Sequence, residues 1–136
     1  MIRTLVLANV LLGACATAPV SVIPVVPAVD ECAELAGDWT VDLSNEPGQP
    51  YTKPMRLTLA PEGTATGSFY ESEILAGRWK TDRGRTCVSF RTTDGAGPYH
   101  TAACLVLDAT GSHVEGQTWA EGRAFLFNWN AVRAPK

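Results

Sequence analysis

Hydrophobic and polar residues alternate along much of the chain between residues 37 and 133. In the segment 38–43, with the sequence DWTVDL, every second residue is hydrophobic, and the segment 55–60, MRLTLA, repeats this pattern. Successive side chains of a β-strand point to opposite faces, so such a segment buries one face and exposes the other. Both segments are therefore predicted to be half-buried strands.

Short clusters of Gly, Pro, Asn, Asp and Ser, the residues that favour turns, divide the chain at regular intervals. The eight expected strands cover residues 37–43, 53–60, 64–72, 75–82, 85–93, 98–108, 113–121 and 124–133. No helix-length segment lies between them to connect parallel strands, so neighbouring strands are expected to be antiparallel and in up-and-down order. The sequence thus predicts an all-β fold, a single antiparallel up-and-down eight-stranded barrel.

The first residues do not follow this pattern. Arg3 precedes a hydrophobic run over residues 5–12, which is shorter than the roughly 20 residues that span a bilayer and is typical of a cleaved signal peptide. The run ends in Leu12-Gly13-Ala14-Cys15, which resembles the lipobox of bacterial lipoproteins. That resemblance implies cleavage of residues 1–14 and a lipid chain on Cys15. The alternative is an ordinary signal peptide in which Cys15 is incidental.

Acyl chains on Cys15 would hold the protein to a membrane without a spanning helix. Ala16 follows the cysteine, where lipoproteins kept at the inner membrane carry aspartate, so the resemblance implies the outer membrane, facing the periplasm. Residues 15–31 contain prolines that forbid a regular helix and favour an extended tether, about 3 Å per residue. The valines of this tether leave open that it lies in an apolar groove of its own domain or of a partner.

Composition narrows the functional classes. The 136 residues, of which 46% are hydrophobic, are expected to form one globular domain, assigned to residues 32–136. The formal net charge is −3, and the 18% of residues that are charged form no basic face. Because binding to a phosphate backbone needs clustered positive charge, nucleic acid is not expected as a partner.

The pairing of residues outward from one turn suggests a disulfide. If the chain reverses at residues 94–97, Cys87 lies opposite Cys104 on the outer face of the barrel. Opposed residues of antiparallel strands are close enough for a disulfide, and an exported protein meets an oxidising compartment. Three pairings of these two cysteines with Cys32 are possible; this register favours Cys87 with Cys104 and leaves Cys32 unpaired.

Several short motifs occur in the order found in avidins: GDW at 37–39, GTATGSFYES at 63–72, LAGRW at 75–79 and QTW at 117–119. The chain resembles avidins, which are eight-stranded barrels that bind biotin, and GDW is also similar to the start of lipocalins, where the tryptophan packs on the barrel floor. The avidin resemblance implies that Tyr70 and Ser72 hold the polar head of a ligand and that Trp119 stacks on it.

Three departures argue against biotin itself. Val41 stands where avidins have an asparagine, the lid loop is reduced to Glu73-Ile74, and Phe90 replaces a stacking tryptophan. We therefore expect another small apolar or amphipathic ligand. The candidate lining residues are Tyr70, Ser72, Trp79, Phe90, Tyr99, Trp119, Phe127 and Trp129.

Phe69 and Tyr70 are neighbours in an expected strand, so their side chains are expected to point to opposite faces. We expect Tyr70 and Ser72 to point inward with Trp119 close by; in a filled barrel, Phe69 would point inward instead.

The function expected from these features is a lipid-anchored envelope protein whose barrel binds a small molecule. One alternative is an interaction protein such as a periplasmic protease inhibitor, because one inhibitor family also combines such a barrel with an inserted N-terminal arm. The other is a filled, structural barrel. No enzyme motif, cofactor or metal-ligand spacing is present, and His100, His113, Glu71 and Glu73 all have simple structural interpretations, so no catalytic residue is expected.

Overall fold

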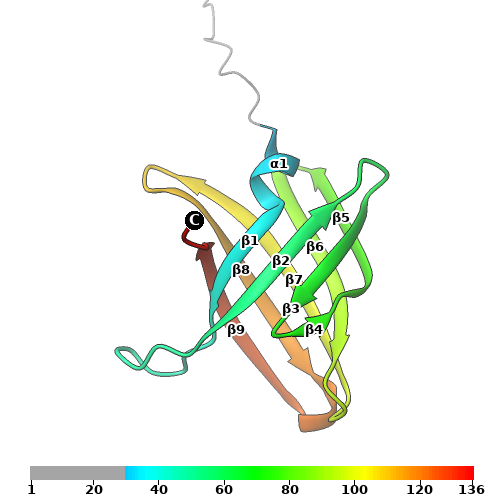
Figure 1. The fold of residues 1–136 in the computed structure, drawn as a ribbon, viewed down its shortest axis with the longest axis vertical. Helices are drawn as coiled ribbons and strands as arrows, with labels where there is room; N and C mark the ends of the chain where they lie inside the picture. The colour runs from blue at the N-terminus through cyan, green and yellow to red at the C-terminus, as the bar shows by residue number, and fades with distance from the viewer. Residues whose placement is uncertain (1–29) are drawn as a thin grey trace, which may run out of the picture.

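A closed antiparallel β-barrel forms the body of the computed structural model, which describes residues 30–136 (Figure 1). The elements in chain order are α1 (Glu31–Leu35), β1 (Gly37–Asp42), β2 (Thr52–Leu59), β3 (Thr64–Phe69), β4 (Ser72–Glu73), β5 (Leu75–Asp82), β6 (Arg85–Thr93), β7 (Pro98–Asp108), β8 (Gly111–Ala120), the 3-10 helix η1 (Glu121–Arg123) and β9 (Phe125–Arg133). The expected signal peptide, Cys15 and the tether up to residue 29 lie outside the described residues.

The predicted fold class is confirmed. Consecutive long strands pair with one another, β1 also pairs with β9, and β2 pairs with β3, so the sheet has no open seam between its first and last strands. β4 has only two residues and pairs with β3 alone. The remaining eight strands match the expected segments closely, because each is marked in the sequence by alternation and bounded by turn residues.

One expected strand, 64–72, is wrong in its last three residues. β3 ends at Phe69, and the next two residues, Tyr70 and Glu71, have φ angles of 52° and 65°. Phe69 pairs with Ser72 across this two-residue turn. Positive φ at both central residues is the geometry of a type I′ hairpin turn, which usually carries Asn-Gly or Asp-Gly, so Tyr70-Glu71 gave no signal of it in the sequence. The turn breaks the alternation on which the expected orientation of Tyr70 depended.

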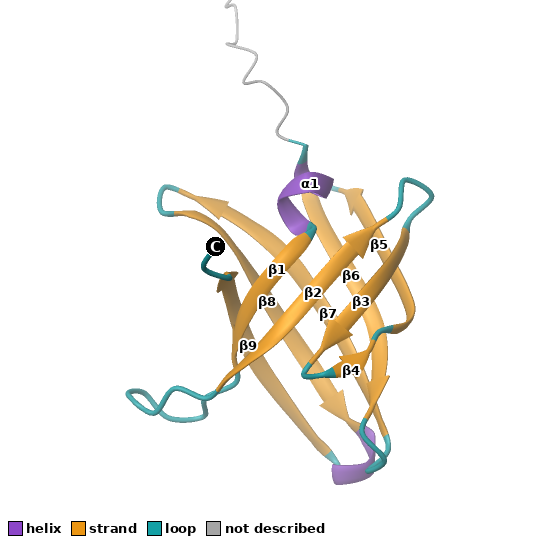
Figure 2. Cartoon of the chain, in the orientation of Figure 1, coloured by secondary structure: helices purple, strands orange, loops and turns teal. Residues whose placement is uncertain are grey.

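The helix α1 covers one end of the barrel, which we call the floor, as Figure 2 shows. Leu35 is fully buried there, and the indole N–H of Trp39 donates to the Leu35 carbonyl at 3.0 Å. The Arg133 guanidinium lies over the Trp39 ring at 4.0 Å and donates to the Ala36 carbonyl at 2.6 Å. The first and last strands thereby hold the helix, a five-residue element that the sequence analysis did not predict.

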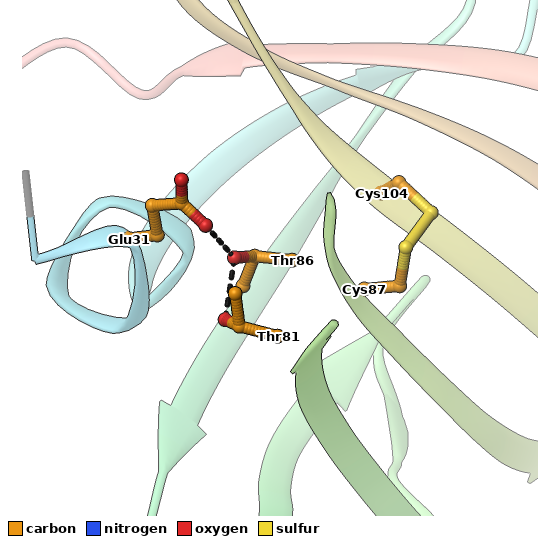
Figure 3. Close-up of a disulfide and its surroundings, with 5 residues drawn as sticks. All are labelled: Glu31, Thr81, Thr86, Cys87 and Cys104. Carbon is orange, nitrogen blue, oxygen red and sulfur yellow. Dashed lines mark hydrogen bonds between the residues drawn. A yellow bond between two sulfur atoms is a disulfide. The ribbon is translucent and has the colours of Figure 1, made fainter. Parts of the chain in front are cut away.

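Side-chain hydroxyls tie α1 to the next part of the wall (Figure 3). Thr86 of β6 donates to the Glu31 carboxylate, and Thr81 of β5 lies 2.6 Å from the Thr86 oxygen. Because the Thr86 proton goes to Glu31, Thr81 is the donor in the second bond. The floor is therefore held from both sides of the barrel.

The predicted disulfide is confirmed. Cys87 of β6 and Cys104 of β7 are register partners and are bonded (Figure 3). Their neighbours Val88 and Ala103 are buried, so the bond lies on the outer face, as the hairpin register predicts. Within residues 30–136, Cys32 is a free thiol.

The middle of the barrel is filled by aromatic side chains. Phe69 packs against Phe90 and Trp129, with ring centroids 5.5 Å and 5.3 Å apart. Trp129 fits because its register partner is Gly116: a Cβ atom on that glycine would lie 2.3 Å from the indole ring. Both tryptophan and glycine are thus required at one level of the barrel.

Replacing Cys87 and Cys104 together by alanine should lower the free energy of unfolding by about 3 kcal/mol, because the bond closes a loop with a sequence separation of 17. Chemical denaturation of the oxidised proteins measures this loss. Cys32→Ala is the matched control and should leave the midpoint unchanged. A loss as large in the control would show that Cys32 takes part in the bonding.

Candidate functional site

The end of the barrel opposite α1 holds a cavity of about 230 Å³, which we call the cup. It lies among the β1–β2, β3–β4, β6–β7 and β8–β9 connections, which gather at that end (Figure 1). Six aromatic residues line it: Tyr51, Phe69, Tyr70, Tyr99, Phe125 and Phe127. Ser72, Thr92, Asp94 and Arg123 are among its polar lining residues. A concave, mainly aromatic site with a few polar groups is the usual form of a small-molecule site.

The strand register places the cup wall. Thr92, Tyr99, Ala120 and Phe125 form one row of partners across β6, β7, β8 and β9. Thr92 and Ala120 in this row are buried, so the row faces the interior. Phe69 then closes the bottom of the cup, because its ring belongs to the aromatic cluster that fills the middle of the barrel.

A pair of tyrosines forms one side of the rim. The hydroxyls of Tyr51 and Tyr70 hydrogen-bond to each other, and their rings meet edge to face at 6.1 Å. The Lys53 ammonium lies 4.9 Å from the centre of the Tyr70 ring. The hydrogen bond with Tyr51, followed by burial, raises the pKa of Tyr70 to about 12, so this phenol stays neutral at physiological pH.

On the opposite side of the rim, Asp94 accepts hydrogen bonds from two groups and lies close to a third, cationic one. It accepts from the Ala96 amide at 3.0 Å and from the Tyr99 hydroxyl at 2.9 Å, and the Arg123 guanidinium lies 3.6 Å away. The hydrogen bond from the Ala96 amide, followed by the hydrogen bond from the Tyr99 hydroxyl, lowers the pKa of Asp94. The carboxylate therefore stays ionised. The positive charge of Arg123 therefore already has a partner.

Buried hydroxyls lie beneath and beside the cup. Thr101 and Thr118 are 2.9 Å apart, and the Trp129 indole donates to Thr118 at 3.0 Å. Thr86 is satisfied at the floor by Glu31 and Thr81. Thr92, the fourth buried threonine, makes no side-chain hydrogen bond to another described residue.

Four of the residues expected from the sequence meet at the cup: Tyr70, Ser72, Tyr99 and Phe127. Phe90 and Trp129 are buried below it, in the aromatic cluster. The structure therefore brings together the polar residues expected from the avidin resemblance and separates them from the expected tryptophans.

Three expected positions are wrong. Trp119 is 41% exposed on the outside of the barrel, because the buried Thr118 and Ala120 on either side of it point inward. Trp79 packs near the floor, where its indole donates to the Ala60 carbonyl at 2.7 Å. Phe69, expected outside, is only 3% exposed, and Tyr70 reaches the rim by way of the hairpin turn rather than by strand alternation.

The sequence analysis missed several cup residues. Thr92 could have been found, because the register about residues 94–97 already sets it opposite Tyr99. Tyr51, Arg123 and Phe125 lie at or beside turns, where no alternation indicates which way a side chain points.

No group of three or more His, Cys, Asp or Glu side chains within residues 30–136 is arranged to hold a metal ion. In the same part of the chain, no helix is both long and apolar enough to cross a membrane. No protein-family model matches the sequence, and no curated protein matches it at a significant level.

Titration of the phenols tests the rim. Because the bond to Tyr51 is the main cause of the raised pKa of Tyr70, Tyr51→Phe should bring that pKa back towards 10. The folded pKa lies above the unfolded one, so Tyr70 should reduce stability as the pH rises from about 10 towards 12. Ultraviolet difference spectra report the ionisation. Trp119→Phe, on the outer face, should leave the titration unchanged; unaltered titration in Tyr51→Phe would contradict the assignment.

Proposed function

We propose that this protein binds a small apolar or amphipathic molecule in the cup. The observation that carries the proposal is the aromatic cavity of about 230 Å³ at the open end of a barrel whose middle is filled. Six aromatic residues line this space, and replacing the water against them by an apolar molecule is favourable. A purely structural barrel has no need of this arrangement.

Biotin is not the ligand that this arrangement favours. Val41, which stands at the asparagine position of avidins, is fully buried in the core and cannot supply a hydrogen bond to a urea group. Phe69 closes the cup from below, so a ligand has access only to the upper part of the barrel. A binding role also needs no reacting group, and we propose no catalytic residue.

We also propose that the protein is a lipoprotein of the bacterial outer membrane, facing the periplasm. The lipobox-like sequence ending in Cys15 supports this proposal, and so does the disulfide, because such bonds persist in an oxidising compartment. Acylation of that cysteine would place the binding barrel at a lipid surface.

Binding should be detectable with 2-naphthol, a two-ring probe, by calorimetry or by the emission of the probe. Phe127→Ala and Tyr70→Ala each remove part of the cup wall and should weaken binding about tenfold, since each forfeits roughly 1–2 kcal/mol of apolar contact. Trp119→Ala is the control, because that side chain lies outside, and should bind as the wild type does. Biotin should give no heat at micromolar concentration. Equal losses in all three variants, or no binding of the probe at all, would refute the cup as the site.

Mass spectrometry of the mature protein, purified from cells competent in lipoprotein processing, tests the anchor. The expected N-terminal residue is Cys15 carrying acyl chains, and Cys15→Ala should release the protein from the outer-membrane fraction. An unmodified N-terminus at another residue would overturn the anchor without affecting the proposal for the cup.

A further inference from the structure

We infer that the ligand of the cup is an uncharged planar aromatic molecule of one or two rings whose buried end carries a hydroxyl or similar group that hydrogen-bonds to Thr92. This inference rests on the proposed function and names the chemical class of its ligand. It follows from one unpartnered hydroxyl, from the hydrogen bonds already made around the rim, and from the size of the cavity.

Thr92 is only 3% exposed, yet it lines the cup. The other three buried threonines hydrogen-bond to neighbouring side chains, whereas the Thr92 hydroxyl has no such partner within residues 30–136. No fully buried side-chain oxygen in this part of the chain lacks a partner, so the Thr92 oxygen must retain access to the cavity. An almost buried hydroxyl open to a cavity offers both a donor and an acceptor to whatever fills it.

The other hydroxyls of the wall are already committed. Tyr99, the register partner of Thr92, donates to Asp94, and Tyr70 shares its bond with Tyr51. These two tyrosines therefore present their rings to a ligand, while Thr92 presents a free hydrogen-bonding group. Ser72 is half-buried at the rim, where water can satisfy it. Aromatic walls with a single deep polar group favour a flat ring with one polar substituent.

The electrostatics of the rim favour a neutral ligand. Arg123 is the cationic group that lines the cup, and its charge is balanced by Asp94 at 3.6 Å. Lys53 lies over the Tyr51 and Tyr70 rings and is not among the lining residues. An ionised ligand would lose hydration among six aromatic residues without gaining an unpaired charge in exchange.

The cavity volume limits the size. A space of about 230 Å³ lies below the roughly 300–1,000 Å³ of pockets that bury drug-sized ligands. A molecule of one or two fused rings therefore suits the cup better than a long-chain fatty acid or a tetrapyrrole.

Titration of the full chain with naphthalene, 2-naphthol and 2-naphthoate tests the inference. The three probes share one ring system and differ only in having no polar group, a neutral hydroxyl or a charge. Wild type should bind 2-naphthol about tenfold more tightly than naphthalene, because only the hydroxyl satisfies Thr92. 2-Naphthoate should bind most weakly.

Two variants isolate the hydroxyl. Thr92→Val keeps the shape of threonine without the hydroxyl and should bring 2-naphthol down to the affinity of naphthalene, while naphthalene itself binds at least as well as before. Thr92→Ser keeps the hydroxyl without the methyl group and should keep the preference for 2-naphthol. Unfolding midpoints measured alongside verify that both variants are folded.

The outcomes separate this inference from the proposed function. Equal binding of naphthalene and 2-naphthol to the wild type, or a preference that survives in Thr92→Val, would overturn the role of Thr92 and leave a binding cup. Tighter binding of 2-naphthoate would overturn the neutral class. If none of the probes binds, the proposed function fails as well.

Discussion

Closure of the sheet is the constraint on which the rest of this structure depends. Once β1 pairs with β9 and β2 with β3, each of the eight long strands has a partner on both sides, and these strands set the interior volume. That volume has to be filled by inward-facing side chains or left for a ligand. Closure also removes the unpaired edges at which a sheet of this kind would aggregate.

Side chains fill one part of this barrel, and the part above them is left open. Near the floor, Leu35 and Trp39 fill the interior and Arg133 holds them in place. In the middle, Trp129 occupies the space that Gly116 leaves open, and Phe69 completes the plug. At the level of Thr92, Tyr99 and Phe125 line the wall without filling the interior, and the cup is the result. The position of the site is thus a consequence of where the large side chains stop.

The rim limits what the cup can bind. The hydrogen bonds of Tyr70 with Tyr51 and of Tyr99 with Asp94 fix the two rings that face the ligand. Asp94 and Arg123 are paired with each other, so the residues that line the cup include no unpaired charge. In the function proposed above, recognition depends on ring shape and on one buried hydroxyl, which together would select small neutral aromatic molecules over lipids or ionic metabolites.

The amino-acid sequence by itself determined the eight strands, their antiparallel order and the Cys87–Cys104 bond, because alternation, turn residues and hairpin register are local properties. The avidin-like motif at 63–72 also indicated that Tyr70 and Ser72 belong to the candidate site. Only the tertiary structure decided that Phe69 points inward and that Trp119 lies outside. Alternation separates the two faces of a strand but does not tell which face is buried when both carry an aromatic residue. That choice depends on contacts between strands far apart in the chain, such as Phe69 with Trp129. The position of Tyr70 at the rim follows from the positive φ angles of the β3–β4 turn.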